Sequence, residues 1–105
     1  MNLVITQSGV FIYKGVKMLQ ENKCCFFCGS TQNLERHHLF GGANRKNSEK
    51  YGLVVYLCHW CHNEPPNGVH HNIDINILLK KHGQKAFEAT HSHEEFMRIF
   101  GKNYL

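Results

Sequence analysis

Residues 25–28 read CFFC and residues 58–62 read CHWCH, so two CxxC pairs are separated by 29 residues of chain. Two residues between thiolates let both sulfurs of one tight turn reach the same ion, and two such turns complete a tetrahedron. Gly29 suits a sharp bend directly after the first pair. The spacing predicts a structural zinc ion with a folded insert between its ligand pairs. The four predicted ligands are Cys25, Cys28, Cys58 and Cys61.

The composition is typical of a small globular protein that needs a metal to stabilise it. The chain has 105 residues, 42% of them hydrophobic and 19% charged, and we expect one domain over residues 1–105. Nine histidines and five cysteines favour metal binding over disulfides in a cytoplasmic protein. The longest apolar run, Leu53 to Cys58, is too short for a membrane span. The net charge of +4 is compatible with a polyanionic partner.

Other interpretations of the cysteine pairs stay open at this point. The cysteines could be buried without a metal, or one pair could be a thioredoxin-like redox motif. Two pairs in so short a chain disfavour the first interpretation, and no βαβ pattern supports the second. Cys24 lies outside both pairs, and we expect it to be a free thiol.

The segment before the cysteines predicts a short β-hairpin. Two β-rich runs, Leu3 to Thr6 and Val10 to Tyr13, are separated by a turn signal at Ser8-Gly9.

The segment from residue 73 onward predicts helices that pack on the core. Ile77, Leu78 and Phe87 contribute to an apolar stripe with helical spacing. A second helix is expected to begin after Ser92, with Glu95 in the position of a capping box, and to end at Gly101. Its apolar face consists of Phe96, Ile99 and Phe100. We expect His82, His91 and His93 to be solvated, and Tyr56 and Trp60 to lie in the core.

Several histidines adjoin the cysteine pairs, namely His37, His38, His62, His70 and His71. Phosphodiester hydrolysis needs a base for water, a cation near the leaving oxygen and a donor for the phosphate. A neutral imidazole can act as the base near pH 7, and further imidazoles can hold the cation. The cationic residues around the insert, Arg36, Arg45 and Lys46, are candidates for contacts with a nucleic-acid backbone.

The combination of these motifs resembles the HNH endonucleases of the ββα-metal group. The likeness lies in ERHH at residues 35–38, in LCxxCH at 57–62 and in GVH at 68–70, with a core at about residues 24–72. It is greatest for small phage and prophage proteins related to recombination-enhancing, RecA-dependent nucleases. The resemblance implies an α+β fold in which a small ββα-metal core is clamped by a four-cysteine zinc site. The N-terminal hairpin and the C-terminal helices would flank that core.

The resemblance also implies a role for each histidine. His38 takes the place of the general base, and His37 that of a ligand to a catalytic divalent ion. His62 is a second ligand. His70 would contact the metal or the phosphate, with His71 as its close competitor for substrate contact. The ion could be Mg²⁺, Mn²⁺, Ni²⁺ or Zn²⁺.

The chain departs from the HNH pattern at the middle asparagine. Residues 51–56 read YGLVVY, where such proteins usually carry this residue, and only Asn44 or Asn47 lies upstream to replace it. In addition, Pro65-Pro66 ends any helix soon after His62, so His70 must return to the site through a loop.

Two function classes follow from the sequence. The first is a metal-dependent DNA endonuclease of phage or prophage origin, acting in the bacterial cytoplasm on DNA, with a recombinase filament or other phage proteins as further partners. The second is a non-catalytic zinc-ribbon protein that binds nucleic acid or assists recombination. Cleavage of a plasmid in the presence of a divalent ion distinguishes the two.

Overall fold

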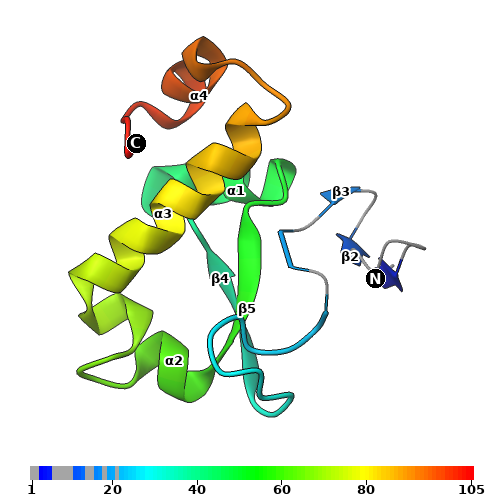
Figure 1. Cartoon of the computed structure of the whole chain (residues 1–105), viewed down its shortest axis with the longest axis vertical. Coiled ribbons are helices and arrows are strands. Elements are labelled where there is room, and N and C mark those ends of the chain that lie inside the picture. The colour runs from blue at the N-terminus through cyan, green and yellow to red at the C-terminus, as the bar shows by residue number, and fades with distance from the viewer. Residues whose placement is uncertain (1–2, 6–10, 14–15, 18, 21) are drawn as a thin grey trace.

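The computed structural model describes residues 3–5, 11–13, 16–17, 19–20 and 22–105. Its elements are the strands β1 to β5, the α-helices α1 to α4 and two short 3₁₀ helices. Figure 1 shows the long helix α3 (Ile73–Glu88) lying across the two-stranded sheet of β4 and β5, with α2 below it and α4 above it. The structure is therefore an α+β fold, as the sequence predicts.

The N-terminal segment forms an antiparallel sheet, in agreement with the predicted hairpin. β1 (Leu3–Ile5) pairs with β2 (Phe11–Tyr13), and β2 pairs in turn with a short third strand, β3 (Val16–Lys17), that the sequence does not predict. The expected turn at residues 8–9 lies outside the described residues. Figure 1 shows this sheet at the edge of the molecule, away from α3 and α4.

The central hairpin joins the two cysteine motifs. β4 (Leu34–His38) runs antiparallel to β5 (Val54–Cys58), and the register places Leu34 opposite Cys58 and His38 opposite Val54. All five residues of β5 are buried, as expected for the longest apolar run in the chain. The segment between the strands contains a 3₁₀ turn, η1 (Gly42–Asn44), and the helix α1 (Arg45–Lys50).

β5 continues directly into α2 (His59–Asn63), which ends before the two prolines as the sequence predicts. The chain then returns through a 3₁₀ turn, η2 (Val69–His71), into α3. At Gly68 the chain passes very close to the end of α2, because a Cβ atom there would lie 2.7 Å from the backbone nitrogen and oxygen of Glu64. Only glycine allows η2 to approach α2 so closely.

The core lies between the sheet, α3 and α4 (His93–Phe100). Four aromatic rings, those of Phe40, Phe87, Phe96 and Phe100, pack with centroids 4.6 to 5.8 Å apart. Complete burial of such side chains contributes on the order of 2 kcal/mol each to folding. α4 begins and ends as predicted, because the Ser92 hydroxyl accepts a hydrogen bond from the amide of Glu95 and Gly101 has a φ of +80°.

The buried face of α3 differs from the predicted one by a single position. Leu79 and Phe87 are buried, whereas Leu78 is 58% exposed. Gly83 lies on the buried face, where a Cβ atom would come within 2.8 Å of the Leu39 side chain. The glycine that weakens the helix pattern in the sequence therefore permits close packing of α3 on the segment that follows β4.

Gln84 is completely buried on the same helix and holds the C-terminal segment. Its side chain accepts a hydrogen bond from the amide of Tyr104 and donates to the Asn103 side chain. Among the residues that the structure describes, no helix combines the length and apolar character needed to cross a bilayer.

Candidate functional site

The four cysteines of the CxxC pairs lie together at the base of the central hairpin. Cys25 and Cys28 come from the loop before β4, Cys58 ends β5, and Cys61 lies in α2. Their sulfur atoms all lie within 4.8 Å of one another, and those of Cys28 and Cys58 are 3.6 Å apart. Sulfur ligands arranged tetrahedrally around zinc are about 3.8 Å apart. The cluster is therefore positioned to bind a metal ion.

Backbone hydrogen bonds fix the loop that carries the first two cysteines. The amide of Gly29 donates to the carbonyl of Cys25, and Gly29 has a φ of +77°, which favours glycine. The amide of Phe26 donates to the carbonyl of Tyr56 and thereby attaches the loop to β5. The sulfur of Cys25 accepts a hydrogen bond from the amide of Cys28. These contacts hold the sulfurs in place through the backbone.

The environment of the thiols favours ionisation at one cysteine and opposes it at another. Burial raises the pKa of Cys25, but hydrogen bonds from the backbone around Cys28, Cys58 and Phe27 outweigh this effect and lower the pKa to about 6. Burial raises the pKa of Cys61, and the adjacent thiols raise it further. Four thiolates in so small a volume repel one another, and a bound cation removes that repulsion.

Three histidines form a second cluster, which we call the histidine trio: His37 from β4, His62 from α2 and His70 from η2. One nitrogen atom from each lies within 4.8 Å of the other two. The ring centroids of His62 and His70 are 4.5 Å apart, and that of His37 is 5.2 Å from each. The structure thus brings together three histidines that the sequence predicts as ligands of a divalent ion.

One ring nitrogen of His37 has no hydrogen-bond partner among the described residues. This nitrogen, Nε2, is buried. The Nε2 atoms of His62 and His70, in contrast, lie 2.8 Å apart, at hydrogen-bond distance from each other. A buried polar atom without a partner carries a free-energy cost that a bound cation would remove. This is the observation that makes the trio fit a metal ion.

Two of the three histidines, His37 and His70, lie in surroundings that favour the neutral form that metal ligation requires. Burial, together with the neighbouring His62 and His70, lowers the pKa of His37 to about 3. Burial also lowers the pKa of His70. Neutral imidazoles offer their lone pairs to a cation without first releasing a proton.

Glu35 orients the trio from the same face of β4 as His37. Its carboxylate accepts hydrogen bonds from Nδ1 of His62 at 2.8 Å and from the Asn63 amide at 2.8 Å. It also contacts Nδ1 of His59 at 3.0 Å. The hydrogen bond with His62 lowers the pKa of Glu35, so the carboxylate stays charged. With Nδ1 donating to Glu35, the lone pair of His62 is on Nε2, which faces the other histidines.

His38 points to the opposite face of β4, since neighbouring residues of a strand alternate. Its Nε2 lies 2.6 Å from a carboxylate oxygen of Glu49 in α1. Arg36 makes two hydrogen bonds to the same carboxylate, at 2.9 and 3.0 Å. Burial lowers the pKa of His38, although Glu49 opposes this effect. His38 is therefore a largely neutral imidazole that a carboxylate holds in one orientation.

The two upstream asparagines do not support the histidines. Asn44 donates to the carbonyl of Phe100 at 3.1 Å, and Asn47 donates to Asn44 at 3.2 Å. The Asn44 amide thus ties η1 to α4, and the Asn47 amide ties α1 to Asn44, so neither hydrogen bond reaches His38. In the structure Glu49, and neither Asn44 nor Asn47, lies beside His38.

Neither Glu35 nor Glu49 was predicted as a site residue from the sequence, although both carry a signal. Glu35 is two residues before His37 and therefore shares its face of the strand. Glu49 is the only acidic residue between His38 and Cys58, so it is the only carboxylate available within the insert.

The other predicted residues are distributed around the two clusters. Arg45 and Lys46 are exposed on α1, which also carries Glu49. His71 is exposed and lies outside the trio, so of the two competing neighbours only His70 joins it. Cys24 is a free thiol outside the cysteine cluster, as predicted.

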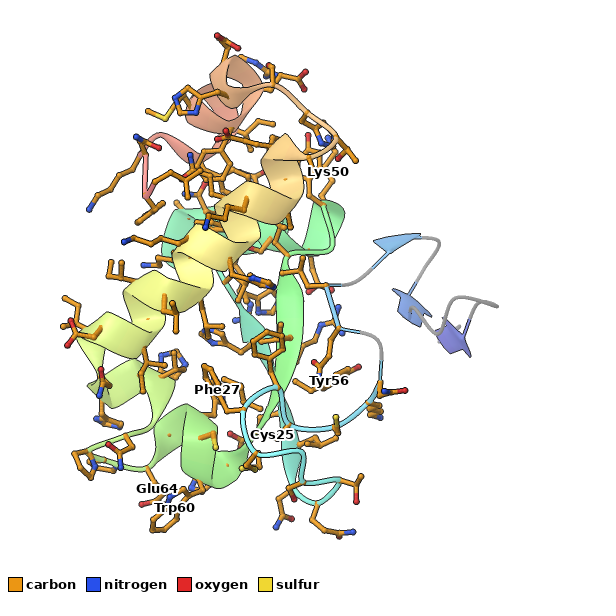
Figure 2. The ribbon with its side chains drawn as sticks, viewed as in Figure 1. Cys25, Phe27, Lys50, Tyr56, Trp60 and Glu64 are labelled. Atoms are coloured by element: carbon orange, nitrogen blue, oxygen red, sulfur yellow. The ribbon has the colours of Figure 1, made fainter. Side chains whose placement is uncertain are left out.

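Predictions for the remaining aromatic residues hold in part. Tyr56 is buried, but Trp60 is 66% exposed on the outer side of α2, so its predicted place in the core is wrong (Figure 2). The residues on either side of Trp60 are held toward the hairpin, because His59 contacts Glu35 and Cys61 belongs to the cysteine cluster. Trp60 therefore points outward. His82 and His93 are exposed as expected, whereas His91 is half-buried and stacks on Phe87 at 4.2 Å.

Comparisons of the chain with protein-family models, with curated proteins and with solved structures give no match. The function therefore has to be inferred from the chemistry of these residues.

Proposed function

We propose that this protein is a metal-dependent DNA endonuclease of the HNH type that hydrolyses phosphodiester bonds. The observation that carries the proposal is the convergence of the histidine trio from three separate elements, β4, α2 and η2, around the unpartnered Nε2 of His37. The hairpin β4–β5 followed by α2 corresponds to the ββα arrangement that the sequence motif implies. His38, which directly follows His37 at the end of β4 and is paired with Glu49, supplies the base.

The cysteine cluster is assigned to a structural zinc ion. Thiolates are the preferred ligands of zinc in sites with four protein ligands and no open position. The histidine trio leaves positions open to water and phosphate, as a catalytic ion requires. A divalent ion bound by His37, His62 and His70 would supply Lewis acidity that stabilises negative charge on the leaving oxygen.

His38 acts as the general base. Its Nε2–H donates to Glu49, which leaves the lone pair on Nδ1. Nδ1 removes a proton from a water molecule, and the resulting hydroxide attacks the phosphorus as the bond to the 3′ oxygen breaks. The products are a 5′-phosphate and, after the 3′ oxygen takes up a proton from solvent, a 3′-hydroxyl. Glu49 stabilises the imidazolium formed on His38.

The exposed cations near this base position the DNA. Arg45 and Lys46 lie on the same helix as Glu49 and are free to contact phosphates on either side of the cleaved bond. Arg36 instead binds Glu49, so its first task is to hold the carboxylate that orients His38.

A plasmid-nicking assay tests the proposal. Zinc-loaded protein is incubated with supercoiled plasmid and with Mg²⁺, Mn²⁺, Ni²⁺ or additional Zn²⁺. We expect nicking with at least one ion, and we expect His38→Ala to reduce the rate by about 10²- to 10⁴-fold, the usual contribution of a general base. His93→Ala is the matched control, because His93 is exposed and pairs with Glu88 at the C-terminal end of α3, outside both metal clusters.

Equal rates for His38→Ala and the parent protein would show that His38 is not the base. DNA binding without nicking under any of these ions would indicate a nucleic-acid-binding zinc module in place of an enzyme.

A further inference from the structure

A groove lies between the cysteine loop and α3, separate from the histidine trio. It encloses about 290 Å³, near the lower limit of cavities that hold small organic molecules. The side chains that matter for its chemistry are Phe26, Phe27, Leu78, Lys81, His82 and Lys85. Figure 2 labels Phe27, which belongs to the same loop as Cys25.

The groove exposes apolar surface that the core does not use. Phe27 is 42% exposed and Leu78 is 58% exposed. Phe26 supports Phe27 edge-on, with ring centroids 5.6 Å apart, and lies 5.6 Å from the His82 ring on α3. Because Cys25 and Cys28 flank the two phenylalanines, the metal cluster would hold both rings rigidly in place.

The rim of the groove is cationic. Lys81 and Lys85 are both exposed and lie one helical turn apart on α3, so their ammonium groups share a face. Among the described residues that line the groove, none carries a carboxylate. An occupant that complements this surface has a flat apolar part and at least one negative charge.

The groove also lies within reach of the proposed cleavage site. α3 begins two residues after η2, which carries His70. Lys81 is eight residues into this helix, so it is roughly 12 Å along the axis from Ile73. A strand of duplex DNA covers this distance in three or four nucleotides, at a rise of about 3.4 Å per nucleotide.

We propose that the groove binds one unpaired nucleotide of the DNA, with its base against Phe27 and Leu78 and its adjacent phosphates on Lys81 and Lys85. Aromatic side chains bind bases of single strands by stacking, and lysines bind the phosphates. In an intact duplex the bases are stacked inside the helix and cannot enter the groove. The inference rests on the proposed nuclease function for its choice of ligand, and it names single-stranded or locally unpaired DNA as the substrate.

Binding of a short fluorescein-labelled oligothymidylate, followed by fluorescence anisotropy, tests this inference. Zinc-loaded full-length protein is used without added divalent ion, so binding is measured apart from cleavage. We expect Phe27→Ala and Phe27→Leu to weaken binding about tenfold, and Phe27→Trp to retain it. The leucine variant keeps the apolar volume and removes the stacking face. Zinc content and circular dichroism equal to those of the parent show that each variant is folded.

The charged rim is tested with Lys81→Gln and Lys85→Gln, and Arg98→Gln, which removes an exposed charge from α4, is the control. Each lysine variant is expected to reduce the slope of log affinity against log salt by about 0.7, and the control should retain the parent slope. An abasic oligonucleotide of the same length should bind at least about tenfold more weakly than oligothymidylate.

Equal binding of the abasic and the intact strand, or unchanged affinity in Phe27→Ala, would overturn the inference. Displacement of the strand by an acidic peptide at equal charge concentration would overturn it as well, because the groove would then recognise charge without a base. If the protein nicks plasmid but the groove variants bind as the parent does, only the groove assignment fails. If those variants lose binding and the parent does not nick, only the nuclease proposal fails.

Discussion

The Nε2 atom of His38 lies 2.6 Å from the carboxylate of Glu49, and Arg36 binds that carboxylate through two further hydrogen bonds. The three side chains come from β4 and α1, two successive elements of the insert between the cysteine pairs. The carboxylate thus has two roles. It orients the His38 ring through Nε2, and it offsets the positive charge of the neighbouring Arg36 guanidinium group.

Replacing this carboxylate tests the orientation of the base. We expect Glu49→Gln to lower the nicking rate about 10- to 100-fold, since an amide can still accept a hydrogen bond but no longer stabilises a positive charge on His38. Glu94→Gln, on the first turn of α4, is the charge-matched control. The rates are compared on the same plasmid at saturating divalent ion. A nicking rate equal to that of the parent would mean that Glu49 has only a structural role.

Loss of one cysteine ligand should remove the fold itself. Metal binding by four thiolates contributes about 10 kcal/mol in small zinc domains, as much as the whole stability of a typical domain. We therefore expect Cys58→Ser to lose one equivalent of zinc and to unfold without a cooperative transition. Cys24→Ser, adjacent to the cluster but not part of it, should keep both. Metal analysis and thermal unfolding provide the measurements, and a stable, zinc-free Cys58→Ser protein would argue against a structural metal.

Glu35 should control the affinity of the histidine trio for its ion. Its carboxylate fixes the His62 ring, and loss of such a contact usually weakens metal binding about 10- to 100-fold. We predict this loss for Glu35→Ala in calorimetric titration of zinc-loaded protein with Mn²⁺ or Ni²⁺. Glu64→Ala is the control, because Glu64 contacts His59 at 3.0 Å and lies outside the trio. Equal losses in both variants would indicate a general electrostatic effect.

Gly83 should be intolerant of a methyl group although alanine is the better helix former. An added Cβ would lie 2.8 Å from Leu39 and 3.0 Å from the Phe40 ring, and both side chains are buried. Overpacking costs about 1–3 kcal/mol, which outweighs a gain of at most about 1 kcal/mol in helix propensity. We expect the melting temperature of Gly83→Ala to fall by several degrees. Gly41→Ala should be neutral, because a Cβ there meets no atom within 4 Å.

The parts of the fold that follow from local chemistry were predictable from the sequence. Ser92, Glu95 and Gly101 determine both ends of α4 through local hydrogen bonds and backbone conformation. The CxxC spacing likewise places sulfurs together wherever the two turns meet. These signals are local and do not depend on how distant elements pack.

Features that depend on tertiary packing were not predictable in the same way. Trp60 resembles a core residue by composition, but the constraints on its two neighbours direct it to the surface. Glu49 approaches His38 because α1 folds back on the hairpin, and the sequence shows only that Glu49 is the sole carboxylate available there, not that it meets His38. The buried face of α3 lies one residue away from the face that the apolar pattern predicts, because the helix packs on Leu39 through Gly83.

Cys61 and His62 are consecutive residues of one short helix, so a single peptide unit connects the sulfur cluster to the imidazole cluster. If the protein is the proposed nuclease, a newly synthesised chain that has not yet bound zinc would have no fixed position for His62 and hence no assembled cleavage centre. Zinc supply would thereby act as a maturation step, and the protein would become able to damage DNA only after its scaffold is complete.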